Sequence, residues 1–160
     1  MMYNDLNTIK TEASMRNIKI INGGWFFSKE AKSAPSSIPT GWQSLDLPYT
    51  WNGKDGQDGG NDYYRGTCWF VKSLTAGELP EGDVKYAQFD GVNSSCEVFW
   101  NGKSIAKHDG GYSTFRVKLE DIKAENILAV AVDNSPNNRV YPQNADFTFY
   151  GGIYRDVSLI

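Results

Sequence analysis

The sequence is poor in the residue types on which most catalytic and metal sites depend. Its 160 residues include one histidine, His108, and two cysteines, Cys68 and Cys96. A closed zinc site needs four such ligands, and a serine–histidine pair needs the histidine beside its nucleophile. We interpret His108 as a turn histidine that bonds to the backbone, so catalysis by this chain alone is poorly supported.

Long apolar runs are also missing. The longest, residues 127–132, falls far short of the roughly 18 residues that a membrane helix needs. Residues 1–16 contain no apolar stretch typical of a signal peptide. We therefore expect no membrane partner and a cytoplasmic location. Each cysteine sits in an apolar stretch, which favours a small buried hydrophobic residue over a disulfide or a metal ligand.

No run of charge of either sign occurs, and the formal net charge is −3 at pH 7. A nucleic-acid-binding protein usually carries a basic patch that displaces phosphate counterions, so we expect no nucleic acid partner. Hydrophobic residues make up 40% of the chain and aromatic residues 14%, which is ample for a packed core. The length fits a single domain.

Strand signals fill the chain from residue 16 onward. Residues 114–119 alternate between apolar and polar side chains, and residues 127–132 predict a central strand covered on both faces. The Asn101-Gly102 pair predicts a two-residue hairpin turn. Residues 153–159 predict the last strand. No segment has the apolar spacing of a sustained helix.

These signals predict an all-β fold, an antiparallel β-sandwich of about eight strands, for which a jelly roll is the natural candidate. We expect residues 1–15 to form a flexible N-terminal tail and residues 16–160 to form the jelly-roll domain. Residues 31–41, rich in serine and proline, predict a surface loop.

Two polar segments are candidates for ligand binding. Residues 52–62 are dense in glycine and predict a long loop, whose aspartates lack the spacing of a calcium-binding loop and favour a solvated segment. Residues 137–147 combine amides, a carboxylate and aromatic rings, which suits a sugar-binding loop and an ordinary connection equally. The tryptophans could stack on sugars, but their positions in strands favour the core. They are Trp25, Trp42, Trp51, Trp69 and Trp100.

Five segments also resemble a known family. They are residues 46–52 (DLPYTWN), 64–70 (YRGTCWF), 89–102 (FDGVNSSCEVFWNG), 108–115 (HDGGYSTF) and 152–157 (GIYRDV). In this order they are similar to the patterns D-x-P-H-x-W, Y-R-G-x-x-W-Y, F-x-G-V-x…V-x-x-N-G, G-G-Y-x-x-F and G-I-[YF]-R-D-V of family 2 glycoside hydrolases. Tyr49 stands where histidine is usual. The family comprises β-galactosidases, β-glucuronidases and β-mannosidases.

The resemblance implies an N-terminal domain of the sugar-binding type, a galactose-binding-domain-like jelly roll that precedes an immunoglobulin-like domain and a catalytic TIM barrel. It implies retaining hydrolysis of O-glycosyl bonds by two glutamates that belong to the barrel. We therefore expect an accessory domain of a β-glycosidase of the β-galactosidase type, without catalytic residues and inactive alone. The alternatives are a self-standing carbohydrate-binding module or lectin, and an interaction domain that has lost sugar contact.

The resemblance also implies site residues. In β-galactosidases an aspartate shortly before G-I-[YF]-R-D-V lines the galactose pocket and a sodium site, and counting back from Gly152 places it at Asp146. An asparagine upstream of the tryptophan-bearing strand corresponds to Asn61. With Asn144, these are the predicted substrate-binding residues, and Asp146 is also the predicted metal ligand.

The resemblance further implies partners. They are a carbohydrate substrate and the remainder of the enzyme, which would be a homo-oligomer and could hold sodium or magnesium. This chain itself is expected to require no cofactor. Because the following domains would cover part of its surface, we expect an exposed apolar or aromatic patch.

Overall fold

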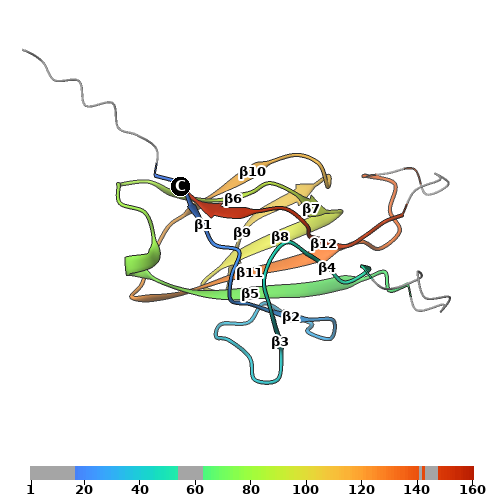
Figure 1. Cartoon of the computed structure of the whole chain (residues 1–160), viewed down its shortest axis with the longest axis horizontal. Coiled ribbons are helices and arrows are strands. Elements are labelled where there is room, and N and C mark those ends of the chain that lie inside the picture. The colour runs from blue at the N-terminus through green and yellow to red at the C-terminus, as the bar shows by residue number, and fades with distance from the viewer. Residues whose placement is uncertain (1–16, 54–62, 141, 143–147) are drawn as a thin grey trace, which may run out of the picture.

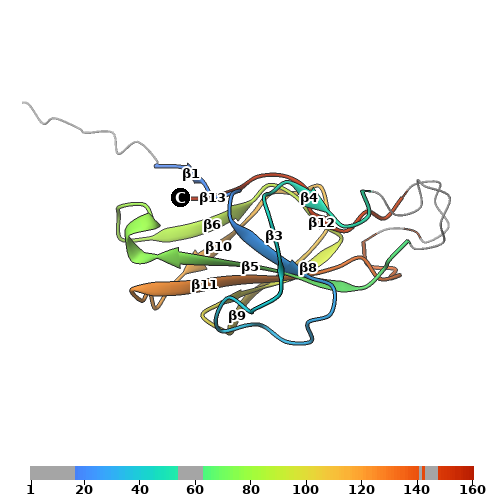
Figure 2. The ribbon, with the colours of Figure 1, turned by 60° about the horizontal axis from the view of Figure 1, so that its bottom comes forward.

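The computed structural model describes residues 17–53, 63–140, 142 and 148–160. Their regular structure is almost entirely strand, arranged in antiparallel sheets (Figures 1 and 2). The one helix in these ranges is a short 3₁₀ turn, η1 (Ala76–Glu78). The predicted all-β sandwich is confirmed, and no helix in the described ranges is long and apolar enough to cross a membrane.

The strands form sheets of six, four and three members. The six-stranded sheet has the order β3 (Gln43–Leu45), β2 (Trp25–Ser28), β5 (Thr67–Thr75), β11 (Glu125–Asp133), β8 (Ser95–Trp100), β9 (Lys103–Asp109). The four-stranded sheet has the order β1 (Lys19–Ile20), β13 (Val157–Leu159), β6 (Lys85–Phe89), β10 (Phe115–Leu119). The three-stranded sheet has the order β4 (Tyr49–Thr50), β12 (Gly152–Ile153), β7 (Val92–Asn93). These thirteen segments in the described ranges exceed the predicted eight because several contain only two or three residues.

One continuous core joins all three sheets. Strand β11 lies between β5 and β8, and residues 128–130 and 132 are buried, as the apolar run predicts. Opposite them, the four-stranded sheet contributes alternate residues such as Val117 and Leu119 of β10, while Arg116 and Lys118 face the solvent. Four of the five tryptophans are buried, and Trp42 packs in a second apolar cluster described below. The prediction that they belong to the core is therefore confirmed.

The β8–β9 hairpin follows its predicted turn. Trp100 pairs with Lys103, so the loop contains only Asn101 and Gly102. Their φ angles are 53° and 82°, the positive values that a type I′ turn requires. The local sequence therefore determines this connection.

The segment from residue 153 to 159 is not one strand, as predicted, but two. Strand β12 belongs to the three-stranded sheet and β13 to the four-stranded sheet. Between them, the backbone carbonyl of Asp156 accepts the N–H of Asp90, and its carboxylate accepts the side-chain amide of Asn22 at 2.8 Å. These long-range contacts redirect the chain from one sheet to the next.

The loop between β2 and β3 covers part of the six-stranded sheet. Ala31, Ala34, Ile38 and Trp42 pack against a second apolar cluster of Trp69, Val71 and Ala129 on the outer face of that sheet. Figures 1 and 2 show this segment extending beyond the sheets. The predicted loop is confirmed, but it shields apolar side chains as well as lying at the surface.

Both cysteines are free and buried, as predicted. Cys68 and Cys96 lie opposite Val132 on either side of β11. Two strands that flank a third are about 9–10 Å apart, which is too far for a disulfide. Burial raises the pKa of the Cys96 thiol to about 12.

Candidate functional site

The stems of two loops lie at the same end of the sandwich, away from η1 (Figures 1 and 2). One loop follows β4 and the other follows β11. Because the strands that carry them neighbour one another in space, parts of all five family-like segments meet at this end. The contacts of those segments with one another, with Asn134 and with residues 148–151 define the candidate site.

Strand β4 and the segment before β12 hold this end together. Thr50 pairs with Gly152, and its Oγ1 donates to the carbonyl of Gly151 at 2.8 Å. The N–H of Gly151 donates to Oδ1 of Asn52 at 2.8 Å. A Cβ at position 151 would lie only 1.9 Å from the indole of Trp51, so the close packing of these two segments requires glycine.

Two fully buried asparagines connect the loop stems. Asn52 and Asn134 are each 0% exposed. Nδ2 of Asn134 donates to Oδ1 of Asn52 at 3.0 Å and to the carbonyl of Phe149 at 2.8 Å. Its Oδ1 accepts the N–H of Gly66 at 2.8 Å. Nδ2 of Asn52 donates to the carbonyl of Tyr64, also at 2.8 Å.

The sequence alone does not single out Asn134. Its one local signal is its place directly after β11, two residues beyond the apolar run, where a polar residue usually marks the start of an exposed loop. Asn52 lies in a family-like segment, but nothing in the sequence indicates that it is buried. Their pairing joins residues that are 82 positions apart.

An uncharged pocket of about 320 Å³ lies beside the stems. Tyr112 at its rim is 72% exposed, and its ring lies 6.4 Å from that of Tyr154. The hydroxyl of Tyr154 donates to the carbonyl of Gly111, and Nδ2 of Asn93 donates to that of Tyr150. One exposed and two half-buried tyrosine rings beside amide and hydroxyl groups suit a wet, partly apolar interface. The lining consists of Thr50, Asn93, Tyr112, Thr148, Tyr150 and Tyr154.

The three predicted substrate-binding residues, Asn61, Asn144 and Asp146, lie outside the described residues. Their nearest described neighbours do meet: Tyr63, two residues after Asn61, has its ring centre 6.3 Å from that of Tyr150. The aspartates of the glycine-rich loop, at positions 55, 58 and 62, also lie outside the described residues.

The predicted metal ligand is therefore not placed by the structure. Within the described ranges, no group of three or more histidine, cysteine, aspartate or glutamate side chains could hold a metal ion.

His108 lies within β9, not in a turn as predicted, because β9 continues to Asp109. Its Nε2 is 3.1 Å from the carbonyl of Gly110 and 3.0 Å from Oγ of Ser113, and its ring stacks on Phe115 with centres 4.1 Å apart. The predicted bond to the backbone is present. A carbonyl oxygen can only accept, so this bond places the hydrogen on Nε2 and ties the imidazole ring to the backbone just after β9.

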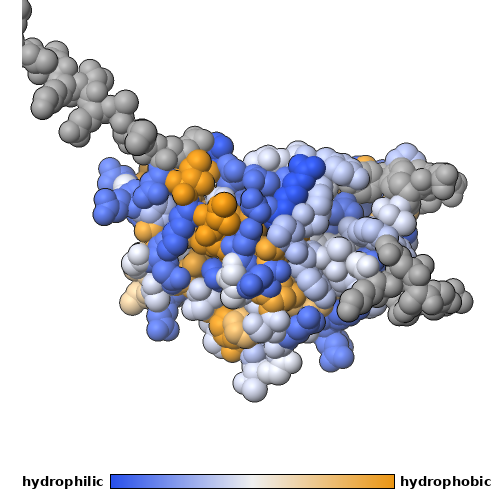
Figure 3. Space-filling model, viewed as in Figure 1, coloured by the Kyte–Doolittle hydropathy of each residue, from blue (hydrophilic) through white to orange (hydrophobic). Residues whose placement is uncertain are grey.

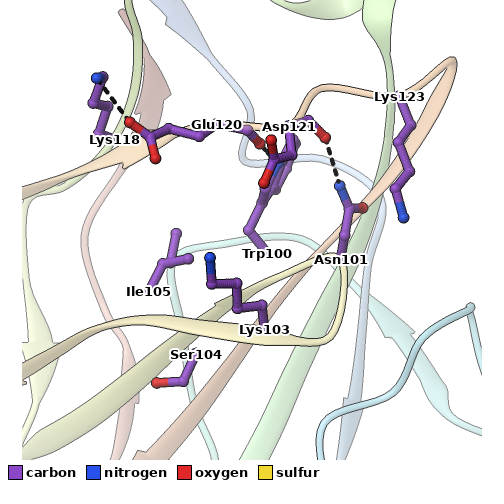
Figure 4. Close-up of a pocket in the computed structure, with 9 residues that line it drawn as sticks. All are labelled: Trp100, Asn101, Lys103, Ser104, Ile105, Lys118, Glu120, Asp121 and Lys123. Atoms are coloured by element: carbon purple, nitrogen blue, oxygen red, sulfur yellow. Dashed lines mark hydrogen bonds and ion pairs between the residues drawn. The ribbon is translucent and has the colours of Figure 1, made fainter.

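A second pocket, of about 470 Å³, lies near the β8–β9 turn, at the end that carries η1 (Figure 4). Trp100 forms part of its wall and donates Nε1–H to the carbonyl of Glu120 at 2.7 Å. Lys118 and Glu120 form an ion pair at 2.8 Å that raises the pKa of the lysine and lowers that of the glutamate. Because charges of both signs line this open pocket, we assign it no ligand.

The chain is similar to known proteins along most of its length. A family model described as glycosyl hydrolases family 2, sugar binding domain, matches residues 57–160. A β-glucuronidase of Bacteroides fragilis is 35% identical over 158 residues, which cover 97% of this chain and 22% of that protein. A β-galactosidase of Thermoanaerobacterium thermosulfurigenes is 29% identical over 158 residues, which cover 91% of this chain and 21% of that protein.

The fold agrees with these similarities. The crystal structure of a β-glucuronidase of Bacteroides uniformis superposes with a TM-score of 0.75 at 36% sequence identity, over 89% of this chain and 17% of that chain. The chain thus spans about a fifth of the length of the relatives that it matches.

Proposed function

Because this chain belongs to glycosyl hydrolase family 2 and carries the sugar binding domain of that family, we propose that it serves as an accessory domain of a longer β-glycosidase. One observation carries the proposal: the stems of the two loops that bear Asn61 and Asp146 are joined at one end, beside an uncharged tyrosine pocket. That arrangement brings the stems of both loops to one end of the domain, where a single partner surface would contact them.

In this proposal the chain contributes to binding and the remainder of the protein contributes catalysis. Two carboxyl groups about 5–5.5 Å apart perform retaining glycoside hydrolysis, and the family resemblance places them in the barrel. We therefore assign Asp146, Asn61 and Asn144 to substrate binding and no residue of this chain to bond cleavage.

The nature of the sugar is a separate question. The relatives carry the names β-glucuronidase and β-galactosidase, so the β-galactosidase expected from the sequence is one of two candidates. Assays of the longer protein with nitrophenyl β-galactoside and nitrophenyl β-glucuronide distinguish them. We expect turnover of at least one, and none by the isolated chain.

The role of Asp146 is tested in the longer protein. We expect Asp146→Ala to lower kcat/KM at least tenfold, which corresponds to about 1.4 kcal/mol of transition-state stabilisation. Asn138→Ala, an exposed asparagine of the same segment, is the matched control and should change kcat/KM less than twofold. Equal kinetics for the two variants would show that Asp146 does not bind substrate.

The tyrosine pocket is the surface that we expect the catalytic part to cover. Ile18 and Ile20 are also exposed, at 55% and 59%. On the face drawn in Figure 3, the apolar groups lie among polar ones. Acetylation of Tyr112 by N-acetylimidazole should be rapid in the isolated chain and at least tenfold slower in the longer protein. Equal rates would place the interface elsewhere.

The alternative is a self-standing carbohydrate-binding module. It predicts that the isolated chain binds sugars tightly by itself, whereas a half-built site should bind at millimolar strength or not at all. Titration calorimetry of the chain with galactose and glucuronate distinguishes the two.

A further inference from the structure

The buried pair Asn52 and Asn134 links two loop stems through side chains instead of through a β-ladder. A buried amide without partners costs several kcal/mol, so a fully buried asparagine persists where its hydrogen bonds are made. Both side chains here satisfy that condition. The partners of their side chains among the described residues lie in the two stems or in each other.

The contacts are arranged so that each asparagine contacts both stems. Asn52, at the start of the first loop, reaches the second loop by accepting the N–H of Gly151 at 2.8 Å. Asn134, at the start of the second loop, reaches the end of the first by accepting the N–H of Gly66 at 2.8 Å. The direct bond between them, 3.0 Å long, closes the link.

Neighbouring groups support the link. The carbonyl of Tyr64 accepts both Nδ2–H of Asn52 at 2.8 Å and Nε1–H of Trp51 at 3.2 Å. Nε of Arg65 donates to the backbone carbonyl of Asn134 at 2.9 Å, and its guanidinium lies 4.2 Å from the ring centre of Phe149. The separation of the two stems is therefore fixed by several directional contacts, which tolerate little displacement.

The same chain contains a useful comparison. Asn126 is also 0% exposed, at the end of the sandwich that carries η1. Its Oδ1 accepts the N–H of Lys123 at 2.8 Å, and its Nδ2 donates to the carbonyl of Lys123 at 2.8 Å and to that of Leu74 at 3.3 Å. It resembles Asn134 in burial and in its number of partners, but contacts neither loop stem.

We propose that Asn52 and Asn134 are positioning residues for substrate binding: they fix the stem of the loop after β4 against the stem of the loop after β11. This inference rests on the proposed function, because a fixed distance between the loops matters only if both reach one substrate. A displacement of about 1 Å in a positioned group can lower a rate by about a hundredfold. The kinetic benefit of a rigid link between the stems can therefore outweigh the cost of burying two polar side chains.

The test compares Asn52→Ser, Asn134→Ser and Asn126→Ser in the longer protein. All three shorten a buried amide, so we expect similar losses of thermal stability. Measured well below each melting temperature, kcat/KM should fall at least tenfold for the first two and stay within twofold for Asn126→Ser. Equal kinetic losses for all three, or wild-type kinetics for Asn52→Ser and Asn134→Ser, would overturn the proposal.

A milder variant covers the case in which those proteins do not fold. Thr50→Val keeps the side-chain volume and removes two bonds of Oγ1, to the carbonyl of Gly151 at 2.8 Å and from the N–H of Asn52 at 3.3 Å. We expect a threefold or greater loss of kcat/KM. A folded Thr50→Val enzyme with wild-type kcat/KM would contradict the positioning role.

A second readout does not use activity. In the isolated chain, Asn134→Ser should accelerate hydrogen exchange of the Gly66 amide at least tenfold, and Asn52→Ser that of the Gly151 amide. Asn126→Ser should accelerate the Lys123 amide and leave both glycines unchanged. If exchange is faster but the kinetics of the variant enzyme are unaltered, the positioning role is refuted and the proposed function is not. If the wild-type longer protein cleaves no β-glycoside, the proposed function itself is refuted.

Discussion

The contact between Gly151 and Trp51 gives the most direct test of how the loop-bearing end is built. An added Cβ at position 151 would lie 1.9, 2.4 and 2.5 Å from Cζ2, Cη2 and Cε2 of the indole, whereas non-bonded carbon atoms prefer about 3.5–4 Å. The indole has little room to move, because Trp51 is 4% exposed and packs beside Phe27 and Phe70. Its Nε1–H also donates to the carbonyl of Tyr64.

The size of the effect follows from these constraints. Overpacking of a core costs about 1–3 kcal/mol, and loss of a buried tryptophan about 3–5 kcal/mol. We expect Gly151→Ala to lower the free energy of unfolding by about 3 kcal/mol, at the overlap of the two ranges. For a chain of this size, that loss lowers Tm by about 6–12 °C. Urea and thermal unfolding, followed by circular dichroism, measure both quantities.

Two further variants isolate the cause. Gly77→Ala is the matched control, because a Cβ there meets nothing within 4 Å and its φ is not positive, so its stability should equal or slightly exceed that of the wild type. In a Trp51→Phe background the smaller ring leaves room, and the added cost of Gly151→Ala should be at least 1 kcal/mol lower. A Gly151→Ala protein as stable as Gly77→Ala would refute the argument.

Three other predictions concern single sites. Gly102→Ala, at φ 82° with open space around it, should cost about 1–2 kcal/mol through backbone strain alone, and an unchanged urea midpoint would contradict the turn geometry. Because burial raises the pKa of Cys96 to about 12, its native thiol should react with a disulfide reagent at pH 8 only after unfolding; labelling within minutes in native buffer would show that it is accessible. Hydrogen bonds from Thr75 lower the pKa of Glu78, so its stabilisation is present above the unfolded pKa near 4.5 and is lost as the pH falls through the lower folded value. Because solvent screens this carboxylate, Glu78→Gln should cost only a few tenths of a kcal/mol at pH 7, and less at pH 3. An equal cost at both pH values would exclude the charge as its source.

The parts of the fold that could be predicted are those determined by neighbouring residues in the sequence. The Asn101-Gly102 turn, the alternation of β10 and the apolar run of β11 follow from backbone preference and side-chain periodicity. The two predictions that were wrong, a single strand over residues 153–159 and a turn at His108, concern features with long-range causes. The break between β12 and β13 depends on Asn22 and Asp90, which are distant in sequence, and His108 continues a strand because Cys96 pairs with it.

The same distinction between local and long-range causes applies to the candidate site. The family-like segments are visible in the sequence, and their order correctly indicates the family. Their convergence depends on tertiary contacts, and a buried asparagine such as Asn134 looks in the sequence like any loop asparagine, since burial is decided by what covers it. Asn61, Asn144 and Asp146 stay predictions, because they lie outside the described residues.

The pairing of β1 with β13 has a consequence for the order in which the domain is made. Lys19 and Ile20 lie opposite Leu159 and Ser158, so β1 cannot pair until β13, about 140 residues later in the chain, has been synthesised. At about 5–20 residues per second, that interval is roughly 7–28 s, and for roughly the last 3–14 s of it β6 is complete and remains an open sheet edge on the side that β13 later fills. Among the described residues, β1 has no other strand partner. Shortening the chain by its last four residues would therefore remove two strands from the sheet, β13 directly and β1 with it.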